Sequence, residues 1–305
     1  MLRSTSVLAC LLTLLPACNL SKLTANASAD MVYAGSSALD HESDPQFARE
    51  AFPASLKTLE TFLVNTPENE PLLLLLARGY NSYAFGFLED DLDRASIDGT
   101  EEEIDELTRR AKIFYLRGSE YGWRLLDEPE LREAAEAADL DRVGELLKDI
   151  KPEQQPALFW ATYGWASAIN LSKDDPAMMA GLGPAKELMR RAYELDPGYN
   201  GGAPTLFFGV LNASIPKALG GQPEVSKKFF EEALERSGGE SLMVAFLFAR
   251  YYCPAAQDRA LWDTLMKRVL TADVTAMPQE MRLTNELARS RARFWSAHVE
   301  DLILE

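Results

Sequence analysis

Histidine and cysteine are scarce in this chain of 305 residues, which contains two histidines and three cysteines. His41 and His298 lie far apart, and neither has a cysteine or a carboxylate at the spacing of a zinc site. No Ser–His–Asp or Cys–His arrangement can be assembled from these residues. The composition therefore argues against a metal site and against nucleophilic catalysis. We expect a protein that is not an enzyme and carries no cofactor.

Basic residues are also in short supply, because 31 Lys and Arg stand against 47 Asp and Glu, giving a formal net charge of −16. This balance disfavours binding to nucleic acid and electrostatic docking on anionic lipid. The acidic run Glu89-Asp90-Asp91-Leu92-Asp93 invites comparison with a calcium loop, but Ser96 stands where an EF-hand requires glycine. We interpret the run as a solvated loop.

Long apolar segments are missing except at the N-terminus. Arg3 precedes an apolar stretch from Val7 to Leu15, which is too short for a final membrane anchor. The stretch ends in Leu15-Pro16-Ala17-Cys18, which resembles a bacterial lipobox. It predicts a signal peptide over residues 1–17 and lipidation of Cys18. An ordinary secretory signal that is cleaved elsewhere is the alternative.

Lipidation would leave a single thiol, Cys253, because Cys10 departs with the signal peptide. One thiol cannot form an internal disulfide, and we expect Cys253 to be a small buried residue. Residues 18–44 are predicted to be the lipidated cysteine and a tether with little order. The chain would then face an extracytoplasmic compartment of a bacterium, held to the membrane by its N-terminal lipid. Asn19 in place of Asp slightly favours the outer membrane.

From residue 45 to 305 the apolar pattern is helical, and no segment alternates with the period of a strand. Prolines and glycines separate the helices, and Thr100-x-x-Glu103 is a capping box. An acidic helix is predicted over residues 130–150. Helical hairpins are predicted over residues 45–87, 71–126, 156–197 and 204–236. We therefore predict an all-α fold of tetratricopeptide-like hairpins stacked into one compact helical domain.

The hairpin at residues 156–197 shows the spacing of a tetratricopeptide unit most clearly. Its first helix carries Trp160-x-x-Tyr163-Gly164, and its second carries Ala185 and Ala192 before Pro197. The small residues predict close packing of Gly164 against Ala185, with Trp160 filling the gap beside them. About nine extra residues, within 172–183, enlarge the turn between the two helices.

Longer stretches resemble the TatT family, periplasmic lipoproteins associated with tripartite ATP-independent periplasmic (TRAP) transporters. The resemblance is carried by Pro156-Ala157-Leu158-Phe159-Trp160-Ala161, Met189-x-Arg191-Ala192-x-Glu194-Leu195-Asp196-Pro197, Gly202-Ala203-Pro204-x-Leu206-Phe207-Phe208-Gly209 and Ala213-x-Ile215-Pro216-Lys217-x-Leu219-Gly220-Gly221. It implies a homotrimer whose subunits each hold an apolar pocket. It also implies a partner solute-binding protein of a TRAP transporter and a hydrophobic or organic-acid ligand.

A second function stays open, namely a tetratricopeptide adaptor lipoprotein in envelope or outer-membrane assembly. An adaptor needs a concave outer groove, whereas a transport component needs an apolar cavity within the subunit. We expect Trp160 and Phe208 to pack in the core because they occupy the large-residue positions of the repeat. The candidate ligand-binding residues are Trp165 and Phe207 beside those positions, Asn170 and Asn212 on helices, the lone cation Lys217, and Tyr83.

Overall fold

The structure, a computed structural model, describes residues 26–27, 29, 31–215 and 221–304. All regular structure in this part of the chain is helical, which confirms the predicted all-α class. The longer helices are α3 (Pro45–Asn65), α4 (Glu70–Tyr83), α6 (Glu101–Leu126), α9 (Gln155–Asn170), α11 (Leu182–Leu195), α12 (Tyr199–Ser214), α13 (Pro223–Arg236), α16 (Arg259–Thr271) and α17 (Arg282–Ala297). The shorter ones are α2 (Ser37–Asp40), α5 (Glu89–Asp98), α7 (Pro129–Glu136), α8 (Leu140–Leu146), α10 (Pro176–Ala180), α14 (Leu242–Leu247) and α15 (Cys253–Ala256).

Several helices begin where the sequence provides a capping side chain. Asp44 accepts hydrogen bonds from the backbone N–H groups of Gln46 and Phe47 at the start of α3, and Thr100 accepts one from Glu103 at the start of α6. These bonds satisfy amides that have no partner within the helix. The capping residues therefore fix the first residue of each helix, as the sequence predicts for Thr100.

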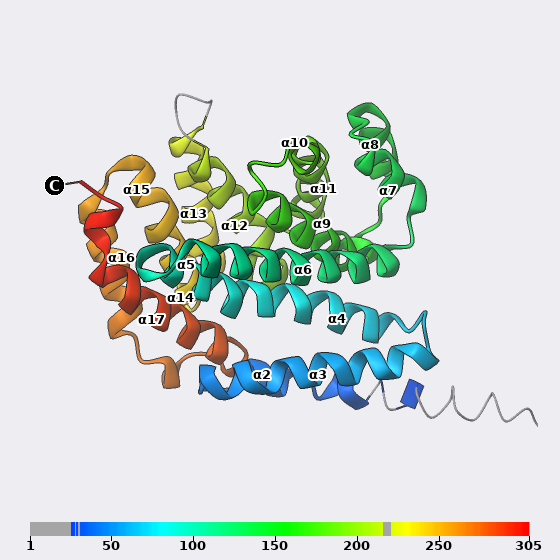
Figure 1. Cartoon of the computed structure of the whole chain (residues 1–305), viewed down its shortest axis with the longest axis horizontal. Coiled ribbons are helices and arrows are strands. Elements are labelled where there is room, and N and C mark those ends of the chain that lie inside the picture. The colour runs from blue at the N-terminus through cyan, green and yellow to red at the C-terminus, as the bar shows by residue number, and fades with distance from the viewer. Residues whose placement is uncertain (1–25, 28, 30, 216–220, 305) are drawn as a thin grey trace, which may run out of the picture.

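The predicted helix pairs lie side by side and form one compact domain (Figure 1). Helix α3 packs on α4, α4 on α6, α9 on α11, and α12 on α13. Helix α6 also packs along α9, and α17 contacts both α2 and α3. The C-terminal helix therefore closes back on the N-terminal part of the described chain.

Two segments depart from the predicted pattern. The acidic helix expected over residues 130–150 is divided into α7 and α8, because Ala138 adopts a left-handed conformation with φ of 55°. The enlarged turn of the hairpin at residues 156–197 contains α10, which is capped by Asp175. Residues 130–150 are largely helical as predicted, but their sequence does not show the break, because Ala138 has no side-chain feature that favours a left-handed turn. The short helix within the enlarged turn was not predicted.

Ordered structure also begins earlier in the chain than the sequence suggests. Residues 31–40 of the polar segment before Pro45 include α2, and Ala29 is fully buried. Asp40, at the end of α2, forms an ion pair with Arg78 of α4, which ties this segment to the domain. The helical part of the chain therefore starts before Pro45, where we expected a tether with little order. Cys18 lies outside the described residues.

Glycines bring α6 and α9 into backbone contact at the centre of the domain. Gly164 of α9 does not face Ala185 as predicted, because a Cβ on Gly164 would lie 2.4 Å from the carbonyl oxygen of Tyr115 in α6. Gly122 of α6 lies equally close to α9, where its Cβ would be 2.4 Å from the amide nitrogen of Ala161. Any side chain at these positions would push α6 and α9 apart.

Asn81 of α4 is fully buried beside this contact. Its Nδ2 donates to the carbonyl oxygens of Ala77 at 2.9 Å and Trp160 at 3.1 Å, and Ser119 Oγ donates to the carbonyl of Ala161 at 2.7 Å. These bonds satisfy polar groups that would otherwise be costly inside the core. Helices α4, α6 and α9 therefore form a rigid unit.

The close contact between α6 and α9 predicts that a single added methyl group lowers the stability of the fold strongly. Gly122→Ala should lower the free energy of unfolding by about 1–3 kcal/mol, because the added Cβ overlaps the backbone of α9. Gly144→Ala in α8 is the matched control, since a Cβ there meets nothing within 4 Å. That variant should gain about 0.5–1 kcal/mol from helix propensity. Urea denaturation measures both, and equal effects of the two changes would contradict the packing argument.

Candidate functional site

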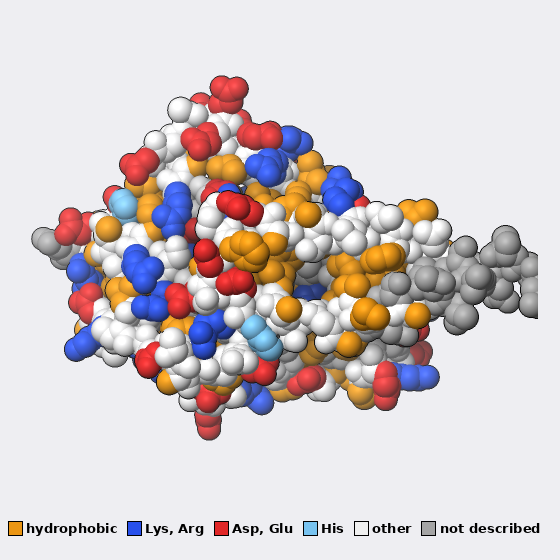
Figure 2. Space-filling model, turned by 90° about the horizontal axis from the view of Figure 1, so that it is seen from below, with side chains coloured by type: hydrophobic (Ala, Val, Ile, Leu, Met, Phe, Trp, Pro, Cys, Tyr) orange, Lys and Arg blue, Asp and Glu red, His pale blue; other side chains and the backbone are white. Residues whose placement is uncertain are grey.

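A cavity of about 1590 Å³ that opens to the surface lies between the helices of the domain. Its wall is built by residues of α2, α3, α4, α9, α12, α14 and α17 and by two π-helices, η1 (Ala84–Leu88) and η5 (Phe248–Tyr252). Most of the wall is apolar, with large side chains such as Phe85, Phe159, Trp160, Leu206, Phe207 and Met243. Seen from below, hydrophobic side chains surround a hollow on the surface of the molecule (Figure 2). The cavity is large enough for a small organic ligand.

The candidate residues chosen from the sequence divide between the cavity and the core. Phe207 and Asn170 line the cavity. Asn212 instead donates to the carbonyl oxygen of Phe208 within its own helix, at 2.8 Å. Trp165 packs its ring against Gly181 rather than toward the cavity. Of the two aromatic residues displaced by one position from the packing positions, Phe207 lies on the cavity wall and Trp165 does not.

Tyr83, the remaining aromatic candidate, is buried between other rings, with Phe87 and Phe114 at centroid distances of 5.2 and 5.3 Å. Trp160 is buried as expected, yet it also forms part of the cavity wall. Phe208 is only half-buried and stacks on Phe229 at 5.3 Å. Lys217 lies outside the described residues.

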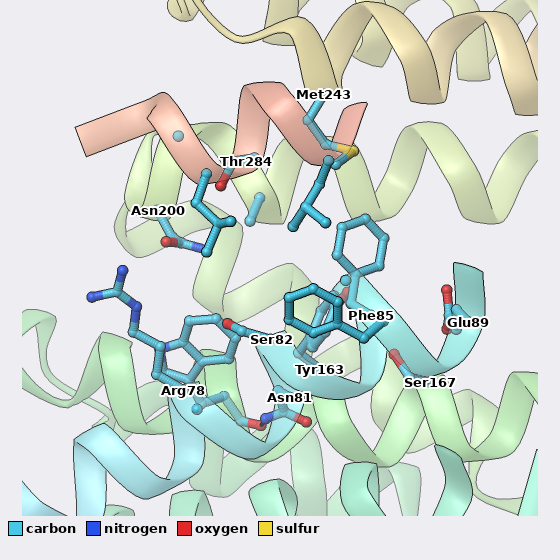
Figure 3. Close-up of a pocket in the computed structure, with 18 of the residues that line it drawn as sticks. Arg78, Asn81, Ser82, Phe85, Glu89, Tyr163, Ser167, Asn200, Met243 and Thr284 are labelled. Atoms are coloured by element: carbon cyan, nitrogen blue, oxygen red, sulfur yellow. Dashed lines mark hydrogen bonds between the residues drawn. The ribbon is translucent and has the colours of Figure 1, made fainter. Parts of the chain in front are cut away.

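Arg78 provides a positive charge on the cavity wall. Its Nη2 donates to both carboxylate oxygens of Asp40, at 2.7 and 2.6 Å. No described residue accepts a hydrogen bond from its Nε or Nη1, so these donors are available to a ligand. Ser82, Asn200 and Thr284 line the cavity in the same view (Figure 3).

Glu89 provides an acidic group at another part of the wall (Figure 3). Its Oε1 accepts a hydrogen bond of 2.6 Å from the hydroxyl of Tyr115, which is fully buried. Burial raises the pKa of Glu89 to about 7, although Arg291 and the bond from Tyr115 act in the opposite direction. Burial and the charge of Glu89 together raise the pKa of Tyr251 to about 12. Water is therefore largely replaced by protein around this carboxyl group.

Behind Glu89 lies an ion-pair network around Arg291, whose side chain is 2% exposed. Arg291 Nη2 donates to Asp93 Oδ2 at 2.7 Å, and Trp295 Nε1 donates to the same oxygen at 3.3 Å. Arg250 lies 3.6 Å from the other oxygen of Asp93. The acidic run is therefore not a solvated loop, as we expected, but the start of α5 with two of its carboxylates, Glu89 and Asp93, directed into the protein.

Both π-helices contribute to this region. Phe85 of η1 and Tyr251 of η5 line the cavity. Arg291 Nη1 donates to the carbonyl oxygen of Phe85 at 3.3 Å, so the guanidinium supports the backbone of η1. π-Helical turns occur often at functional sites, because the wider turn redirects side chains. Here they turn aromatic side chains toward the cavity.

Sequence reasoning missed Glu89 and its network. One signal was available, because the acidic run over residues 89–93 is matched by the arginine-rich segment Arg289-Ser290-Arg291-Ala292-Arg293 near the C-terminus. The sequence alone does not show that these two segments meet. Within the described residues, no group of His, Cys, Asp and Glu side chains has the arrangement of a metal site.

These features define a helical protein with a large, mostly apolar cavity whose wall includes the guanidinium group of Arg78 and the carboxyl group of Glu89. Residues 41–303 match the family described as TRAP transporter T-component. The chain therefore belongs to this family, which confirms the resemblance and connects the protein to a TRAP transporter. An uncharacterized protein of Treponema pallidum (strain Nichols) is 26% identical over 266 residues, covering 87% of this chain and 82% of the relative. Among the described helices, none has both the length and the apolar character of a membrane crossing.

The raised pKa of Glu89 predicts a pH-dependent stability. The folded chain holds the proton more tightly than an unfolded chain with the ordinary value of 4.5. The contribution of Glu89 to stability is therefore present below that value and is lost as the pH rises through about 7. Relative to Glu89→Gln, the wild-type protein should lose about 3 kcal/mol of unfolding free energy between about pH 4 and about pH 8.

Denaturant unfolding of both proteins over this pH range measures the difference. A Glu280→Gln variant, changed at an exposed position of the cavity wall, controls for the loss of one acidic residue. If the stability curves of wild type and Glu89→Gln run parallel, the carboxyl group is not perturbed by burial.

Proposed function

We propose that this protein is a non-enzymatic component of a TRAP transporter that binds a hydrophobic or amphipathic organic acid in its cavity. It would pass this ligand to or from a periplasmic solute-binding protein. The observation that carries the proposal is the mostly apolar cavity of about 1590 Å³ in a member of the T-component family. An adaptor that grips proteins in a shallow outer groove has no need of an apolar cavity of this size.

The distribution of polar groups supports an amphipathic ligand. Apolar walls favour a hydrocarbon body through burial of its surface, and a few polar groups orient it. Arg78 can receive a carboxylate, because a guanidinium has five N–H donors and Asp40 occupies only Nη2. Of the two ends of the ligand, the carboxylate would therefore lie at Arg78.

Anchoring and assembly belong to the same proposal. The lipobox ending at Cys18 supports attachment to the periplasmic side of a bacterial membrane through a lipid, with the outer membrane slightly favoured. The resemblance to the TatT family supports a homotrimer and a solute-binding partner. The face of the molecule seen in Figure 2 has acidic and basic side chains in mixed arrangement, which suits a protein held near but not within the bilayer.

Filling the cavity should abolish ligand binding without unfolding the protein. Ser82→Trp places a large ring in the cavity, whereas Thr264→Trp adds the same ring to the exposed face of α16. We expect Ser82→Trp to weaken binding of the fluorescent fatty acid cis-parinarate by about tenfold or more, roughly 1.4 kcal/mol. Thr264→Trp should bind like the wild type. Equal binding by all three proteins would show that the cavity is not the ligand site.

Assembly can be tested on the mature protein extracted from its native envelope in mild detergent. Native mass spectrometry should show three copies of the lipid-modified chain, together with a periplasmic solute-binding protein or a small apolar ligand. A monomer that co-purifies with cell-wall or outer-membrane assembly factors would instead support the adaptor function.

A further inference from the structure

Glu89 carries one oxygen atom that the described chain does not satisfy. Oε1 accepts the bond from Tyr115, but no described residue donates to Oε2. Glu89 lines the cavity and is only partly exposed. Because this oxygen is accessible from the cavity, the contents of the cavity are the available source of a hydrogen bond to Oε2. A ligand that displaces water there has to supply a donor of its own, or the oxygen loses its hydrogen bond.

The charges around Glu89 indicate what kind of donor fits. The network is balanced when Glu89 is ionised, because its three carboxylates face three guanidinium groups: Glu89, Asp90 and Asp93 against Arg94, Arg250 and Arg291. An added ammonium group would leave a positive charge without a partner, and an added carboxylate would repel Glu89. A neutral donor, such as a hydroxyl group, keeps the balance.

The neighbours of Glu89 form a small polar region in a cavity wall that is otherwise mostly apolar. Tyr163 and Ser167 line the cavity and supply hydroxyl groups, while Phe85 supplies an apolar ring (Figure 3). Tyr251 also lines the cavity and adds a third hydroxyl group. Such a combination suits the end of a mostly apolar molecule.

We propose that Glu89 binds a hydroxyl group at the end of the ligand opposite its carboxylate, so that the cavity selects hydroxylated, otherwise apolar organic acids. This inference rests on the proposed function. Arg78 and Glu89 lie on one continuous helical segment formed by α4, η1 and α5. Their separation of eleven positions corresponds to about 16 Å along an α-helix at ~1.5 Å per residue. A medium-chain hydroxy acid has this length.

The test compares three ligands of one chain length: dodecanoate, ω-hydroxydodecanoate and ω-methoxydodecanoate. The methoxy group keeps the oxygen and removes the donor. Titration calorimetry on the full-length protein should show ω-hydroxydodecanoate binding about tenfold more tightly than the methoxy acid, because only the hydroxyl satisfies Oε2. In Glu89→Gln, whose amide presents N–H groups to the cavity, this preference should disappear or reverse. Glu235→Gln, at an exposed position of α13 outside the cavity wall, should keep it.

The outcomes separate the two proposals. If none of the three acids binds the wild-type protein, the proposed ligand class is wrong. If all three bind equally, the cavity takes organic acids but Glu89 does not recognise a hydroxyl group. A preference that survives in Glu89→Gln and is lost in Ser167→Ala would assign recognition to Ser167 and overturn the inference. The comparison of the two ω-substituted acids on wild type needs no variant, so it stands even if Glu89→Gln does not fold.

Discussion

The buried guanidinium of Arg291 holds the C-terminal helix against the N-terminal part of the domain. It lies on α17 and binds Asp93 of α5 and the carbonyl oxygen of Phe85 in η1, across about two hundred residues of sequence. Placing an ion in a protein interior costs several kcal/mol, and the cost is recovered only with well-placed partners. The ion pair between Arg291 and Asp93 therefore restrains how α5 and α17 lie relative to one another.

The same contact determines the chemistry of the cavity. Arg291 favours the ionised form of Glu89, while burial favours the protonated form, and burial has the larger effect. Apolar side chains in place of Arg291 and Asp93 could give a fold of similar stability, since buried ion pairs are often no better than well-packed hydrophobic residues. The ion pair of Arg291 and Asp93 is better explained by its effect on Glu89. Without the guanidinium, Glu89 would stay neutral at higher pH and would be a weaker hydrogen-bond acceptor.

Local patterns predicted the helices well, because capping residues such as Asp44 and Thr100 and the apolar spacing act within a few residues. The prediction of a solvated loop for the acidic run at residues 89–93 was wrong. Its composition is that of a solvated segment, and only its pairing with an arginine about two hundred residues away makes burial possible. Gly164 shows the same limit, since its small size indicates a close contact but not whether Ala185 or α6 makes it. Phe207 was chosen because it lies beside a large-residue position of the repeat, whereas no repeat position points to Glu89.

Arg78 and Glu89, the two charged groups that we assign to the ligand, are held with unequal strength. Arg78 pairs with Asp40 of α2, a helix of four residues with no buried side chain, and both partners are about one-quarter to one-third exposed. Such pairs contribute about 0–1 kcal/mol. Glu89 is held by a buried tyrosine in front of an ion-pair network. Local opening of a protein begins where few buried contacts are lost, so the wall near α2 should open at a smaller cost than the wall near Glu89. A ligand would therefore enter and leave through the wall near α2, with its hydroxyl end leading on entry and its carboxylate end leading on exit, while the Glu89 end keeps its geometry.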